Sequence, residues 1–80
     1  MRTPKCVIEA ELADLAREFR IAAGKNRAEA AREFGVARQA IIYAEDRPDK
    51  SFTKLRRRMI EAYSTFEVVG PVFQLKSKEG

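Results

Sequence analysis

The sequence predicts one small, mainly α-helical domain that ends in a short β-strand or hairpin, and three observations support this fold class. The chain has 80 residues, a length that suits a single domain (residues 1–80). Apolar residues recur at spacings of three and four through most of it, as they do along one face of a helix. Over residues 66–76 the pattern changes to a β-prone run, FEVVGPVFQLK.

Four helices are expected, over about residues 10–23, 27–34, 37–46 and 52–65. Gly24 ends the first of them, and Pro48 lies in the loop before the fourth. The face of the fourth helix that we expect to be buried comprises Phe52, Leu55, Met59, Ala62, Tyr63 and Phe66. The side chains that we expect to face away from it are Lys54, Arg56, Arg57, Arg58 and Glu61.

The second and third expected helices, with the turn between them, form a predicted helix-turn-helix core over residues 26–46. Asn26 is a good N-cap, and Glu29 completes a capping-box pattern. Ala31 is small where the next helix would cross, and Gly35 suits the positive φ of the turn. The residues expected to be buried between the two helices are Val36 and Ile41. An ordinary helical hairpin that binds nothing is the alternative interpretation.

From about residue 12 to residue 66 the chain resembles the phage Cro and repressor type of helix-turn-helix DNA-binding domain. The resemblance is strongest in FRIAAGKNRAEAAREFGVARQAIIYAE, residues 19–45. It implies a four-to-five-helix, lambda-repressor-like or Cro-like fold, with a salt bridge between Arg20 and Glu45 that ties the first helix to the recognition helix. The chain departs from the family pattern at Arg27, where glutamine is usual, and at Ala30 and Ala44, where larger apolar residues are usual.

The β-prone tail resembles the Cro branch of that family, in which C-terminal strands build the dimer. Isolated strands are not stable, so residues 66–76 need a neighbour. Three neighbours are possible from the sequence: residues 5–8, the tail itself as a hairpin, or a second subunit.

Positive charge is concentrated on the predicted core and the helix after it. Residues 25–58 carry ten basic and five acidic side chains, whereas residues 1–24 carry four of each and residues 59–80 carry two basic and three acidic. The whole of the net charge of +4 therefore comes from the central segment. A basic region on a small domain favours a polyanionic partner, here double-stranded DNA.

Two groups of residues are predicted to contact that DNA. At the start of the third helix, Arg38 suits the O6 and N7 of guanine, and Gln39 suits the N6 and N7 of adenine. Phosphates are bound by basic side chains and by helix N-termini. The predicted base contacts are Ala37, Arg38, Gln39, Ile42 and Tyr43, and the predicted phosphate contacts are Lys25, Asn26, Arg27 and Lys50.

Other functional classes are disfavoured. Without histidine the chain lacks the side chain that titrates near neutral pH, and its four glycines are too scattered for a phosphate loop. We therefore expect no enzyme activity, catalytic residue, cofactor or metal site. A single cysteine, Cys6, indicates a reducing compartment. No apolar run approaches the ~20 residues of a membrane span, so we expect the cytoplasm, in a bacterial nucleoid or a host cell.

The function expected from the sequence is sequence-specific transcriptional regulation, as a Cro-like repressor that binds a palindromic operator as a homodimer. One alternative is an antitoxin-type module, in which the tail binds a toxin protein and DNA binding serves autoregulation. A second alternative is a protein adaptor without a DNA role.

Overall fold

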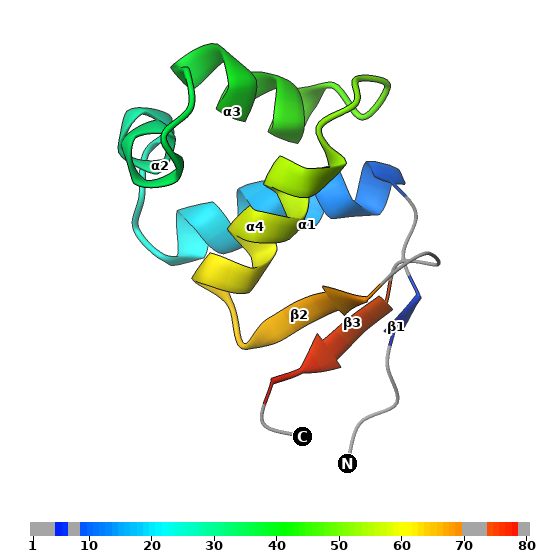
Figure 1. Cartoon of the computed structure of the whole chain (residues 1–80). Coiled ribbons are helices and arrows are strands. Elements are labelled where there is room, and N and C mark those ends of the chain that lie inside the picture. Colours follow the sequence, from blue (N-terminus) through cyan, green and yellow to red (C-terminus); the bar gives the residue numbers. More distant parts are fainter. Residues whose placement is uncertain (1–4, 7–8, 70–73, 79–80) are drawn as a thin grey trace.

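The computed structural model describes residues 5–6, 9–69 and 74–78. The described part is mainly α-helical, as predicted, with the helices gathered above a small sheet (Figure 1). None of these helices is long and apolar enough to cross a bilayer. The elements in chain order are β1 (Lys5–Cys6), α1 (Glu9–Ala22), α2 (Arg27–Phe34), α3 (Arg38–Asp46), α4 (Thr53–Tyr63), β2 (Phe66–Val69) and β3 (Gln74–Ser77).

The sheet is antiparallel, with the strand order β1-β3-β2. Leu75 of β3 lies opposite Lys5 on one side and opposite Val68 on the other. The tail therefore pairs both with itself and with the N-terminal segment, all within one chain. Residues 7–8 of the possible neighbour 5–8, and residues 70–73 of the β-prone run, lie outside the described residues.

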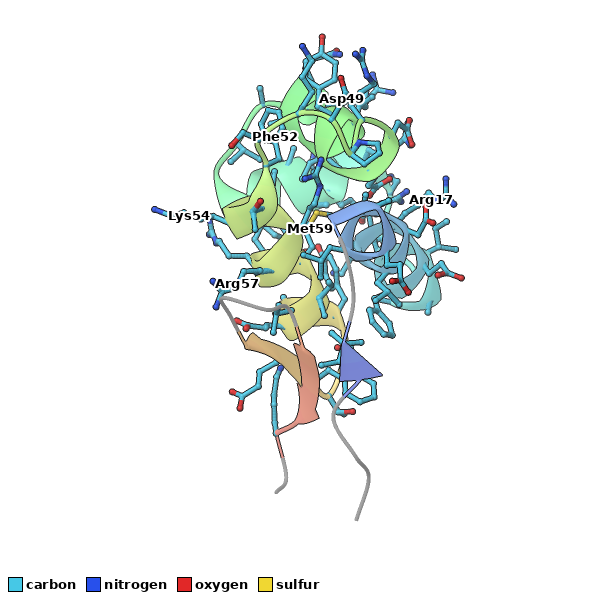
Figure 2. All side chains as sticks on the ribbon, turned by 90° about the vertical axis from the view of Figure 1, so that its right-hand side faces the viewer. Arg17, Asp49, Phe52, Lys54, Arg57 and Met59 are labelled. Carbon is cyan, nitrogen blue, oxygen red and sulfur yellow. The ribbon has the colours of Figure 1, made fainter. Side chains whose placement is uncertain are left out.

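The hydrophobic core lies between α1 and α4 and extends to α3 above and to the sheet below. Met59 of α4 lies at its centre, between the two helices (Figure 2). Val68 and Leu75 close the core from the sheet side. The remaining buried apolar residues of this cluster are Leu12, Ala16, Ala30, Ala31, Ile41, Ala44, Leu55 and Ile60.

The buried face of α4 differs from the expected one. Arg56 and Ile60 are fully buried, whereas Ala62 is exposed, so the prediction that Arg56 faces away was wrong. Phe66 belongs to β2 rather than to this helix. The face that α4 buries is rotated toward Arg56 and Ile60 because α1 and α3 both cover it. Arg56 is compatible with burial because its guanidinium donates to backbone carbonyls.

Both connections between the first three helices have the same backbone geometry. Gly24 and Gly35 adopt positive φ angles of 74° and 66°. After α2, the N–H of Gly35 donates to the carbonyl of Arg32, and the N–H of Val36 donates to the carbonyl of Ala31. This pair of bonds is a Schellman motif, which satisfies carbonyls that the helix leaves without partners. The predicted positive φ at Gly35 is confirmed.

We predict that substitutions at Gly35 destabilise the domain through the backbone alone. A Cβ at this position would meet no atom within 4 Å, so the cost is the left-handed conformation itself. Gly35→Ala should lower the free energy of unfolding by about 1–2 kcal/mol, with Gly35→Asn costing less and Gly35→Val more. Urea denaturation of the three variants checks this order, and three equal stabilities would contradict it.

Candidate nucleic-acid interface

The position of α3 is set by one buried carboxylate, that of Glu45, which is only 2% exposed. Arg20 of α1 donates from Nε and Nη2 to its two oxygens, over 2.5 and 2.9 Å. The same guanidinium donates from Nη1 to the carbonyl of Lys25, over 2.7 Å. The salt bridge implied by the family resemblance is confirmed, and it also holds the loop that leads into α2.

Arg27, at the start of α2, is a second partner of this carboxylate. Its Nε donates to Oε1 of Glu45 over 3.1 Å, and its Nη2 donates to the neighbouring carboxylate of Asp46. Burial lowers the pKa of Arg27, but the two carboxylates outweigh this effect and hold the pKa above its usual value. Sequence reasoning assigned Arg27 to a phosphate and missed this role, because nothing local places it beside Glu45.

The exposed surface of α3 begins at its N-terminal end. Ala37, Arg38 and Gln39 are exposed, whereas Ile42 and Tyr43 are half-buried. Ala37 is the N-cap residue and makes no side-chain capping bond, so the first N–H groups of α3 are not satisfied by a side chain there. Within the described residues, Arg38 and Gln39 make no ion pair or side-chain hydrogen bond. Their donors and acceptors face solvent.

Tyr43 lies on the side of α3 nearest to the following loop. Its ring centroid lies 6.0 Å from that of Phe52, so part of the ring packs on the domain itself. The ammonium of Lys50 lies 5.9 Å from the centroid of the same ring. Tyr43 was predicted as a base contact, and the structure shows its ring packed on Phe52, while Lys50 remains exposed beside it.

A shallow hollow of about 540 Å³ separates the start of α2 from the start of α3. It is lined by Arg20, Asn26, Arg27, Ala28 and Arg38. Three of these five residues are arginines; Arg38 comes from the start of α3, whereas Asn26 and Arg27 come from the start of α2. Arg20 and Arg27 are already paired with Glu45, so within the described residues Arg38 is the cation of this lining that has no carboxylate partner and suits an anion in charge.

No family model, curated protein or solved structure matches this chain. What the surface binds has to follow from the chemistry of its own side chains.

Two predicted phosphate contacts already have partners within the domain. The amide oxygen of Asn26 accepts from the N–H of Glu29 over 2.8 Å, in a capping box that Glu29 completes over 2.9 Å. Lys25 lies 3.0 Å from the carboxylate of Glu33. Hydrogen bonding and charge attraction to Glu33 raise the pKa of Lys25. Both residues keep donors that these contacts do not use, namely the amide NH₂ of Asn26 and the remaining ammonium hydrogens of Lys25.

Glu33 also accepts a hydrogen bond from the hydroxyl of Tyr63 on α4. This bond and the contact with Lys25 lower the pKa of Glu33, and burial together with Glu33 raises the pKa of Tyr63. Arg47 and Asp49 form a second exposed pair. The hydrogen bond between them raises the pKa of Arg47 and lowers the pKa of Asp49. These pairs neutralise two cations of the basic segment and leave Arg38 among those without a carboxylate partner in the described residues.

Glu45→Ala should lower the free energy of unfolding by about 3–5 kcal/mol, because it leaves Arg20 buried without its counterion. Asp46→Ala is the matched control: this neighbouring carboxylate is exposed and shares Arg27, so its loss should cost less than about 1 kcal/mol. Thermal and urea unfolding measure both values. Similar losses in the two variants would contradict the assignment of Glu45 as the buried anchor.

The lowered pKa of Glu33 predicts how its contribution to stability depends on pH. A carboxyl group whose pKa is lower in the folded state stabilises the fold above the ordinary value of 4.5, and this contribution disappears as the pH falls through the lowered value. Glu33→Gln should therefore be less stable than the parent at neutral pH, and the difference should vanish in acid. Urea midpoints across this range test the prediction, with Glu18→Gln on the exposed side of α1 as the control. A difference that persists unchanged in acid would contradict it.

Proposed function

We propose that this protein is a sequence-specific regulator of transcription that binds double-stranded DNA with α3 in the major groove. The observation that carries the proposal is the exposed Arg38–Gln39 pair at the start of a helix whose orientation is fixed by a buried carboxylate. In this proposal, α2, the turn at Gly35 and α3 form a helix-turn-helix of the Cro and repressor type. The resemblance over residues 12–66 supports this interpretation.

Base reading is assigned to the exposed part of α3. Arg38 presents a planar fork of donors that matches guanine, and Gln39 presents a donor and an acceptor that match adenine. Ala37 and Ile42 offer apolar contact to the methyl group of thymine. Tyr43, which is packed against Phe52, is assigned the outer edge of this surface.

Phosphate binding is assigned to the two flanks of α3. On one flank lie Lys25, Asn26 and Arg27, of which Asn26 and Arg27 line the hollow at the start of α2. On the other flank lies Lys50, beside Tyr43. Arg27 already binds Glu45 and Asp46, so its share of the affinity is smaller than that of a cation without such partners.

The proposed active form is a homodimer, since one such domain makes too few base contacts for strong specificity. Two copies related by a two-fold axis match a palindromic operator with half-sites about one helical turn apart. Occupying such a site in a promoter excludes other proteins sterically, which is the proposed route to repression in the cytoplasm or nucleoid.

Selection of binding sites from random duplex DNA tests the proposal as a whole. Recovery of a palindrome with half-sites about 10 base pairs apart would support both DNA reading and the dimer. Recovery of a single unpaired half-site would remove the dimer. The absence of any enriched sequence would overturn the proposed function.

Arg38→Ala and Gln39→Ala should each weaken binding to the selected site by about 1–3 kcal/mol and leave binding to random DNA nearly unchanged. Lys50→Ala is the contrasting variant: it should weaken binding to both DNAs and reduce the salt slope by about one unit. Fluorescence anisotropy over a salt series measures the affinity of each variant for both DNAs and its salt slope. If Arg38→Ala and Lys50→Ala have the same effect on the two DNAs, Arg38 does not read bases.

A further inference from the structure

Arg56 of α4 is a fully buried cation at the carboxyl end of α3. Its Nε donates to the carbonyl of Ala44 over 2.7 Å, and its Nη2 donates to the carbonyl of Arg47 over 2.7 Å. The last carbonyls of a helix have no partner within the helix. A side chain from another helix therefore satisfies the end of α3 here.

The charge of Arg56 also suits this position. The carboxyl end of a helix carries a partial negative charge of roughly half an electron. The last turn of α3 contains no basic residue of its own. Arg56 supplies the cation from α4, so α3 is held by arginines at two places: by Arg20 and Arg27 through Glu45, and by Arg56 through the backbone.

The carbonyl of Arg47 has a second donor that links Arg56 to the loop. The N–H of Lys50 donates to it over 2.9 Å and closes a turn over residues 47–50. One oxygen thus joins α4 to this turn. The turn lies at the end of the molecule away from the sheet, where Figure 2 labels Asp49, and it places the ammonium of Lys50 over the ring of Tyr43.

We propose that Arg56 is a positioning residue for DNA binding, which holds the turn that carries Lys50 at a fixed distance from Arg38 and Gln39. α3 has nine residues and is about 13 Å long, so the phosphate contact and the base contacts lie near its opposite ends. If this separation is already fixed in the free protein, Lys50 and the base-reading residues can contact one DNA segment without the entropy cost of ordering the loop when DNA binds. Arg56 has no exposed surface with which to touch DNA itself.

This inference rests on the proposed function, because Lys50 and Arg38 act as a pair only if DNA is the ligand. Its test is a double-mutant cycle between Arg56→Met and Lys50→Ala, measured as affinity for the selected duplex over a salt series under conditions where circular dichroism shows every variant folded. Each single variant should bind about tenfold more weakly, equivalent to about 1.4 kcal/mol. In each single variant the slope of log K against log salt concentration should also become shallower by about 0.9 unit, which corresponds to one phosphate contact.

The double variant should be no worse than Arg56→Met alone, since the same phosphate contact is lost once. Arg17→Met is the matched control, with the same replacement at an arginine of α1 whose side chain is 42% exposed (Figure 2), and it should leave affinity and slope unchanged. Arg56→Lys keeps the charge but replaces the planar fork with a single ammonium. Arg56→Lys should fold and should show the same decrease in salt slope as Arg56→Met. It therefore tests the proposal even if Arg56→Met does not fold.

Additive losses in this cycle, or an unchanged salt slope in Arg56→Met and Arg56→Lys, would overturn the proposal and leave Arg56 as a stabilising residue only. If the parent protein binds no duplex DNA, the proposed function fails instead. Amide hydrogen exchange then separates the two failures. The Lys50 amide should exchange about tenfold faster in Arg56→Lys, with the Val36 amide of the α2–α3 turn unchanged, and equal exchange at Lys50 would also refute control of the turn by Arg56.

Discussion

The arrangement of the helices depends on the carboxylate of Glu45. It receives donors from Arg20 on α1 and Arg27 on α2 while it belongs to α3 itself. A buried ion pair is costly to form and costly to break, so its main effect is on geometry rather than on net stability. A bidentate arginine fork fixes both the position and the rotation of the helix that carries its partner. The directions of Arg38 and Gln39 follow from that rotation.

The small apolar residues of α3 explain why this polar contact matters so much. Ala44 is fully buried but offers little apolar area, and Ile41 is the larger buried apolar side chain that the helix contributes to the core. Within the described residues no buried side-chain nitrogen or oxygen lacks a hydrogen-bond partner. The domain therefore gives up part of its apolar packing around α3 and replaces it with fully satisfied polar contacts.

The parts of the fold that could be predicted from the sequence follow local rules. Helical periodicity located the four described helices, and Gly24, Gly35 and the Asn26–Glu29 capping box placed the ends of α1 and α2. Glycine at positive φ and a capping side chain depend on residues within one turn, so the sequence carries them directly. The Arg20–Glu45 pair spans 25 residues and came from the family resemblance rather than from any local pattern.

Contacts between distant segments could not be derived in the same way. Arg56 lies four residues after Phe52 and four before Ile60, which is the spacing of a buried face, yet its charge suggested solvent. Its burial depends on carbonyls from another helix, and these are not visible in a periodic pattern. The exposure of Ala37, Arg38 and Gln39 was predictable because exposure at the start of a helix follows from the turn before it. The partners of Arg27 and Lys25 were not predictable from the sequence. The contact of Arg27 with Glu45 depends on how α2 packs against α3, and the contact of Lys25 with Glu33 depends on which residues lie on the outer face of α2.

The strand order has a consequence for how the chain acquires its fold. β3 lies between β1 and β2, and its pairing with β1 joins residues roughly 70 positions apart. The backbone hydrogen bonds within each helix join residues only four apart, whereas closing so long a loop is slow and comes late in folding. During synthesis the helices leave the ribosome before β3 does. A nascent chain that stops before Gln74 has all four described helices, but β1 and β2 lack the strand that joins them, so the sheet forms only after residues 74–77 have been made.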